Sequence, residues 1–251
     1  MDKTILDLKA LGVKLILLCA AGMVFLLPAG MLATLVIYAL SSDSVESYSG
    51  MLPAITGSLY TACVSLAIVV PLSLSVVIYA GEYCRGTRLS QWIRNSFYFG
   101  SSIPAVIWGI CGYFMLQPWG LTPFSVALVI AWMIVPYTSN MLLGAIDRVH
   151  NERMGAYSLG AIPITVIFKI TLPSIRKEFF AAYFLAFGRA LGETLIVVML
   201  LGHTMTSELL FSFDSFHQVH SGMFFLMALV LFILTAVCNL IARYLLKRRS
   251  L

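Results

Sequence analysis

Two charged residues of opposite sign lie inside a long apolar stretch of the sequence. Arg189 and Glu193 are the only charged residues between positions 179 and 202. Arg189 follows the basic pair Arg176-Lys177 by about a dozen residues, which places it roughly 20 Å into a membrane helix at 1.5 Å per residue. An arginine at that depth costs about 2.5–3.5 kcal/mol even on the most lenient insertion scale. An arginine that costs this much in the membrane is therefore expected to have a chemical role.

A guanidinium group at this depth has two chemical uses. Its planar fork can bind an oxyanion on a water-accessible path. It can instead pair with Glu193, which lies one helical turn further on the same face, and only lock the packing of helices. Gly188 and Gly192 share this spacing of four and would let another backbone approach closely. Intramembrane charges face protein interiors and pathways rather than lipid, which favours oxyanion binding on a water-accessible path. The structural ion pair with Glu193 remains the alternative.

The sequence lacks the motifs that mark catalysis by the chain itself. It contains no Walker A GxxxxGK(S/T), HExxH or GxSxG motif, so we predict no catalytic residue and no cofactor, and expect any ATP to be bound by another polypeptide. The five cysteines are scattered singly, which predicts neither disulfides nor a metal site. The net charge of +5 arises from short basic bursts between apolar runs, which excludes nucleic acid as a partner.

The composition is that of a protein whose solvent is lipid. Hydrophobic residues make up 60% of the 251 positions and charged residues 11%, whereas soluble domains carry about a quarter charged residues. A bilayer core needs about 20 apolar residues in a helix. Six segments qualify: 12–40, 54–81, 95–117, 123–146, 178–203 and 222–246. We therefore predict an all-α membrane protein with six transmembrane helices.

The distribution of lysine and arginine predicts the orientation of these helices. Of the 16 basic residues, all except Arg189 lie before or at the start of the first segment, between the second and third, between the fourth and fifth, or at the end of the sixth and after it. The connections 41–53, 118–122 and 204–221 hold none. Because basic loops stay in the cytoplasm, both termini are predicted to be cytoplasmic, in a multi-pass protein of the inner membrane. The opposite connections are short and polar, which predicts no substantial external domain.

The connection at residues 147–177 is the longest predicted soluble stretch. Apolar residues alternate there with polar ones, and Gly160, Pro163 and Pro173 punctuate the pattern. This predicts two short helices joined by a Gly/Pro turn at the cytoplasmic surface. The pattern alone fits an interfacial membrane helix and a docking element for a partner equally well.

The same connection resembles the EAA---G---------I-LP signature of ABC importer permeases. In that family the element forms a coupling helix that sits in a groove of the cytoplasmic ATPase. The spacing from glycine to Ile-x-Leu-Pro matches, whereas Met154 stands in place of the family's glutamate and leaves Glu152 and Arg153 as the neighbouring charges. The resemblance assigns ATPase coupling to Gly155, Ala156, Gly160, Ile170, Leu172 and Pro173.

A second motif indicates which ABC importer permeases this chain resembles most. Residues 188–194 read GRALGET and are similar to the permeases of phosphate-specific transporters, the PstC-like subunit more than its PstA-like partner. The similarity covers about residues 55–203. It implies a substrate path formed by Arg189, Glu193 and Thr194. Tungstate and molybdate permeases carry a related phrase, so another oxyanion remains the alternative substrate.

The resemblance also implies an assembly. The fold would be that of a type I, MetI-like ABC importer permease, with an N-terminal helix in 1–53, a permease domain in 54–251 and a coupling loop in 150–173. Its partners would be a second permease subunit (PstA-like or a second copy), two cytoplasmic ATP-binding subunits and an extracytoplasmic phosphate-binding protein. A secondary transporter driven by an ion gradient is the rival, but no internal inverted repeat is visible. A membrane scaffold would leave Arg189 unexplained.

Overall fold

The computed structural model describes residues 28–39, 48–200, 204–214 and 221–247, and single positions between 14 and 26. Every regular element in this described part of the chain is a helix. The all-α prediction is thereby confirmed. Of the predicted first helix, 12–40, the segment Pro28–Ala39 is an apolar helix and most of the remainder lies outside the described residues.

Three of the predicted membrane helices form continuous apolar helices. Helix α2 (Tyr48–Ile78) runs on into a π-helix, η2 (Tyr79–Tyr83), and α5 (Pro123–Arg148) and α12 (Ser221–Lys247) are the other two. Within them, residues Leu52–Tyr83, Pro123–Arg148 and Phe225–Lys247 are long and apolar enough to cross a membrane. Helix α5 begins with a capping box in which Thr122 and Ser125 exchange side-chain and backbone hydrogen bonds.

The predicted helix 95–117 is not one continuous helix, although its two halves together are long and apolar enough for one broken span. Helix α3 (Arg88–Ser102) and α4 (Ala105–Leu116) meet at a bend of 98°, and a short 3₁₀ turn, η3 (Gln117–Trp119), follows α4. Pro104 causes the break, because a residue that precedes proline is driven out of the helical region. Ile103 accordingly has extended backbone angles, with φ −68° and ψ 126°.

The predicted helix 178–203 is also interrupted. Helix α9 (Arg176–Leu191) ends at Gly192, and the short α10 (Leu195–Met199) follows. A further helix, α11 (Met205–Asp214), occupies part of the stretch 204–221 that was predicted to be a polar outer connection. Residues 204–207 of this stretch are buried and are not a solvated loop. Their hydroxyls hydrogen-bond locally, for example Ser207 Oγ with the Thr204 backbone at 2.9 Å, and buried polar groups are tolerated when paired in this way.

The connection between α5 and α9 contains the short helices that its sequence predicts. They are α6 (His150–Ser158), α7 (Pro163–Val166), the π-helix η4 (Ile167–Thr171) and α8 (Leu172–Ser174). Gly160 lies between α6 and α7 with φ +81°, a left-handed conformation that glycine adopts without strain. We call residues 150–173 the coupling element from here on.

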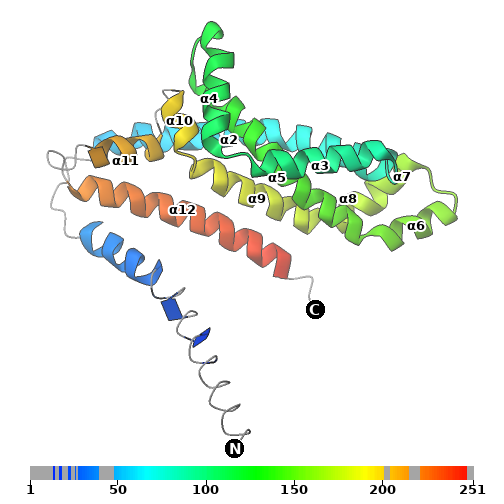
Figure 1. Cartoon of the computed structure of the whole chain (residues 1–251). Coiled ribbons are helices and arrows are strands. Elements are labelled where there is room, and N and C mark those ends of the chain that lie inside the picture. The colour runs from blue at the N-terminus through cyan, green and yellow to red at the C-terminus, as the bar shows by residue number, and fades with distance from the viewer. Residues whose placement is uncertain are drawn as a thin grey trace, which may run out of the picture.

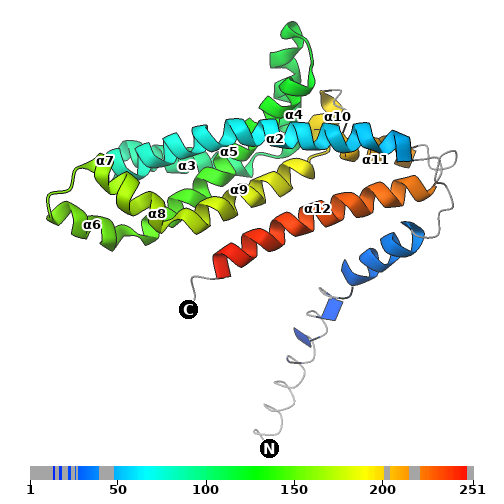
Figure 2. The ribbon, with the colours of Figure 1, turned by 180° about the vertical axis from the view of Figure 1, so that it is seen from behind.

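The long helices lie side by side along one axis, with the coupling element at one end and α11 at the other (Figures 1 and 2). Helix α5 is central, with Ile130, Ile134, Leu142 and Ile146 fully buried among residues of α2 and α9. Helix α4 projects away from this axis (Figure 1) and approaches α10 closely at Gly109. The coupling element precedes α9 in the chain, and Arg189 lies near the opposite end of α9 from it.

Candidate transport path and coupling element

Arg189 lies in the last turn of α9, two residues before the helix ends at Leu191. Its side chain is exposed, while Ala182, Ala186 and Ala190 of the same helix are buried against the core. The guanidinium carbon lies 5.1 Å from the centroid of the Tyr137 ring on α5, a cation–π contact that orients the group without neutralising its charge. The donors of the guanidinium therefore remain available on the outer face of this chain.

Glu193 does not lie one helical turn beyond Arg189. The helix ends at Leu191, and Glu193 lies in the break before α10, where its Oε1 accepts a hydrogen bond from the backbone N–H of Ile196 at 3.4 Å. Within the described residues no ion pair joins Glu193 to Arg189. The predicted pair is therefore not formed, because unwinding at Gly192 removes the spacing on which it depended. Glu193 instead caps the first turn of α10.

Thr194 occupies the N-cap position of α10 and is half-buried. Its carbonyl oxygen accepts from the N–H of Val198 at 3.0 Å. The break is held from behind by α11, since Thr206 Oγ1 donates to the carbonyl oxygen of Glu193 at 2.9 Å and the N–H of Met205 donates to Ser58 Oγ of α2 at 2.8 Å. The predicted path residues thus gather around one helix break, although Glu193 and Thr194 contribute to its shape rather than to a charge pair.

Polar residues of α5 continue from Arg189 toward the coupling element. Half-buried Tyr137 and Asn140 and exposed Gly144 follow one side of α5 at helical spacing. Asn140 Nδ2 donates to Ser101 Oγ of α3 at 3.4 Å, while its buried Oδ1 has no partner among the described residues. These residues of α5 were not among the predicted path residues. The run Tyr137-Thr138-Ser139-Asn140 within an otherwise apolar segment was the signal that could have identified them.

The coupling element presents apolar side chains outward at the end of the bundle. Its most exposed large side chains are Met154, Leu159, Ile162, Ile164 and Phe168, with Leu159 90% exposed. Of the residues predicted to act in coupling, Gly155, Gly160 and Pro173 are exposed, and Ala156, Ile170 and Leu172 are half-buried. Apolar surface of this kind is covered in proteins by lipid or by a partner, the two alternatives that the sequence pattern leaves open. We call the five large side chains the docking patch.

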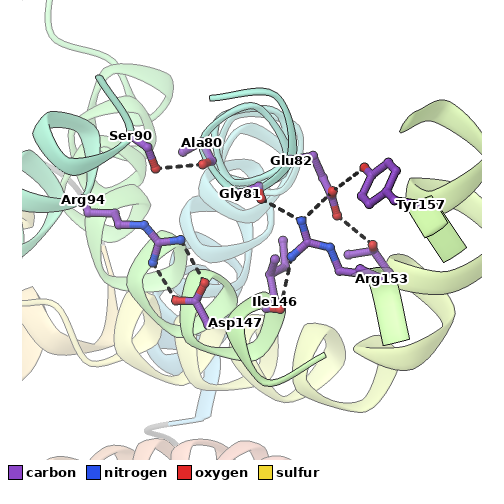
Figure 3. Close-up of polar contacts among 10 residues, drawn as sticks. Ala80, Gly81, Glu82, Ser90, Arg94, Ile146, Asp147, Arg153 and Tyr157 are labelled. Carbon is purple, nitrogen blue, oxygen red and sulfur yellow. Dashed lines mark hydrogen bonds and ion pairs between the residues drawn. The ribbon is translucent and has the colours of Figure 1, made fainter. Parts of the chain in front are cut away.

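A buried polar cluster lies behind the docking patch, where Arg153 of α6 meets Glu82 of η2 (Figure 3). Arg153 Nη2 lies 2.5 Å from Glu82 Oε2, and the two side chains are 1% and 0% exposed. Tyr157 donates to the same oxygen at 3.1 Å, and Thr171 Oγ1 donates to Oε1 at 2.7 Å. Glu82 therefore receives hydrogen bonds from side chains of both α6 and η4.

The two charged residues before Met154, Glu152 and Arg153, have different environments. Arg153 points inward and is buried, whereas Glu152 is exposed and accepts a hydrogen bond from Ser174 Oγ at 2.9 Å. Burial raises the pKa of the Tyr157 phenol, and the charge of Glu82 raises it further, against an opposing effect of Arg153. The phenol therefore stays protonated at neutral pH and acts as a hydrogen-bond donor to Glu82.

Several helices long and apolar enough to cross a membrane, with an exposed guanidinium on one of the broken segments between them, indicate a membrane protein. The family of binding-protein-dependent transport system inner membrane components matches residues 73–251. The chain belongs to this family, and the prediction of a permease of this kind is confirmed. Its localisation follows, since the family consists of inner membrane components.

The chain is similar to phosphate transport system permease proteins PstC from several organisms. It is 26% identical to that of Xylella fastidiosa, over 85% of this chain and 78% of the relative. It is 27% identical to a probable PstC of Methanocaldococcus jannaschii, over 83% of this chain and 78% of the relative.

Solved structures show the same fold. The structure of a bacterial ABC transporter involved in the import of alginate aligns over the whole of both chains with a TM-score of 0.70 and 15% identity. That of an amino acid ABC transporter aligns with a TM-score of 0.62 over 78% of this chain and 92% of the other.

Proposed function

We propose that this chain is the permease subunit of an ATP-driven importer of inorganic phosphate. The observation that carries the proposal is the exposed guanidinium of Arg189 inside an apolar segment, in a chain whose relatives are named phosphate permeases. Phosphate offers the oxygen pairs that a guanidinium fork binds bidentately. The Tyr137 ring holds the fork in place and leaves its N–H groups free to bind.

The remaining path residues have positional roles in this proposal. Glu193 and Thr194 hold the break between α9 and α10, which lets Arg189 project from the end of a helix instead of from a continuous wall. Asn140 and Tyr137 extend the polar side of α5 toward the cytoplasmic end. An anion released by Arg189 would then meet an amide and a phenol rather than a purely apolar surface.

The proposed topology is six spans with both termini in the cytoplasm. Three helices cross by length and composition, and the bent pair of α3 and α4 would make a fourth. The first segment, 1–53, and the broken α9–α10 segment would supply the others, with 54–251 forming the permease domain. The basic residues at the coupling element and at the end of α12 support this orientation.

The docking patch is proposed to bind a cytoplasmic ATPase, which alone would bind ATP. Its five apolar side chains could be covered by a groove, and Gly160 gives the tight turn between α6 and α7. The further partners in this proposal are a second permease subunit, either PstA-like or a second copy, a second ATPase chain, and an external phosphate-binding protein. A related transporter structure was solved in complex with a substrate-bound periplasmic protein, which supports the last of these.

Uptake of radiolabelled phosphate by vesicles that carry the assembled complex tests the proposal. We expect uptake to require both ATP and the binding protein, and to persist after a protonophore collapses the ion gradient. Excess molybdate or tungstate should not compete. Uptake that follows the ion gradient without ATP would favour a secondary transporter, and competition by molybdate or tungstate would assign the path to another oxyanion.

A further inference from the structure

The side chain of Arg153 connects three elements at the cytoplasmic end of the bundle (Figure 3). It projects from α6, binds Glu82 through Nη2, and donates from the same nitrogen to the carbonyl oxygen of Gly81 in η2 at 2.8 Å. Its Nη1 donates to the carbonyl oxygen of Ile146 in α5 at 3.4 Å. A displacement of α6 would therefore pull on the ends of both α2 and α5.

Glu82 completes the connection from the other side. Its second oxygen accepts from Thr171 in η4, the segment that leads through α8 into α9. The polar cluster thus includes the segment that leads into the helix that carries Arg189. Close packing supports the same junction, because a Cβ atom at Gly81 would lie 3.2 Å from the Ile146 side chain. The end of α5 and the η2 turn that ends α2 both meet the coupling element at this cluster.

The cost of burying this ion pair indicates a role other than stability. Removing two charges from water costs several kcal/mol per ion on an order-of-magnitude basis, and apolar residues of similar volume often serve as well or better. Glu82 and Thr171, which donates a hydrogen bond to it, also lie within π-helical turns, η2 and η4. Such turns are rare and occur frequently at functional sites.

A second ion pair at the same end has a different construction. Arg94 of α3 binds Asp147 of α5 with both terminal nitrogens, at 2.6 and 3.0 Å, and the two side chains are 24% and 44% exposed. This pair joins two membrane helices and does not involve the coupling element. It therefore provides a matched control for the loss of an ion pair at this end of the molecule.

We propose that Glu82 and Arg153 are positioning residues that transmit the movement of the coupling element to α2 and α5. Without the pair, an ATPase could still bind the docking patch, but its closure would shift α6 without moving the path. This inference rests on docking of an ATPase as proposed above, and it is independent of whether phosphate is the transported solute.

The test measures how accessible the proposed path is to a thiol reagent, in the assembled complex with its ATPase and second permease chains. A Gly144→Cys thiol serves as reporter, since Gly144 is exposed on α5 and has nothing within 4 Å of an added Cβ. A non-hydrolysable ATP analogue should slow maleimide labelling at position 144 by about tenfold, which requires only about 1.4 kcal/mol of bias between two states. Peptide mass spectrometry localises the label.

The decisive variant carries Glu82→Gln and Arg153→Gln together, which leaves no unpaired buried charge. We expect nucleotide binding to persist while the slowing of labelling disappears, and Arg94→Gln to keep it. Slowing equal to wild type in the double variant would overturn the proposal.

If that variant does not assemble, Thr171→Val decides, because it removes one hydrogen bond to Glu82 and keeps the ion pair. It should lose part of the slowing, and full slowing would overturn the proposal. Phosphate uptake by the wild type separately tests the proposed substrate.

Discussion

At the scale of single residues, Arg189 could be identified as a candidate from its charge, whereas its position relative to Glu193 depended on the geometry of the helix. The cost of a buried guanidinium singled out Arg189 from composition and depth alone, and the structure places it on an outer face beside Tyr137. The pairing with Glu193 could not be predicted, because it required the helix to continue through Gly192. Side-chain charge is visible in a sequence, whereas the end of a helix at a glycine is only one of several outcomes.

Because Arg189 has no ion-pair partner within the described residues, its substitution should affect transport and not assembly. We expect Arg189→Gln to reduce phosphate uptake by about tenfold or more, since hydrogen bonds to charged groups contribute about 1.5–3 kcal/mol. Arg189→Lys should also transport poorly, because an ammonium group lacks the bidentate fork. The measurement is radiolabelled uptake normalised to the amount of assembled complex.

Two comparisons decide how the Arg189 result is interpreted. Arg176→Gln removes a positive charge from the first residue of the same helix and should leave uptake near the wild-type level. Adding Glu193→Gln to Arg189→Gln should not restore uptake, because the two side chains are not paired. Recovery in that double variant would assign Arg189 a purely structural role.

At the scale of elements, the continuous helices could be predicted and the broken ones could not. Pro71 and Pro136 lie inside continuous helices, whereas Pro104 ends α3. A hydropathy window treats these prolines alike, because the difference depends on whether neighbouring helices re-satisfy the freed backbone groups. The coupling element was predicted better, since Gly160 and two prolines mark its turns in the sequence itself.

The turn at Gly160 depends on backbone conformation and not on space. Its φ is +81° and nothing lies within 4 Å of an added Cβ. A left-handed backbone costs most residues about 1–2 kcal/mol, but asparagine adopts it readily. We therefore expect Gly160→Leu to insert normally yet lose transport-stimulated ATP hydrolysis, and Gly160→Asn to retain most of it. Equal ATPase stimulation in both variants would contradict a role for the turn in docking.

The packing of α4 against the bundle gives a prediction about stability. A Cβ atom at Gly112 would lie 2.5 Å from Val129 Cγ2 of α5. Overpacking of this kind costs about 1–3 kcal/mol, so Gly112→Ala should lower the thermal midpoint of the purified complex. Gly144→Ala is the matched control, because that position is open. Equal midpoints for the two variants would show that α4 can shift away from α5 without cost.

At the scale of the whole molecule, the distribution of lysine and arginine predicts which side of the membrane each connection faces. Labelling of exposed residues at the two ends of the helices tests this orientation. Arg88 begins α3 near the coupling element, and Trp119 follows α4 on the connection predicted to lie outside. Both side chains are exposed, so a cysteine at either position should react freely. We expect an impermeant maleimide to label Trp119→Cys in intact cells and Arg88→Cys only after permeabilisation. The parent chain sets the background from its native cysteines. Labelling of Arg88→Cys in intact cells would reverse the orientation and move the docking patch away from any cytoplasmic ATPase.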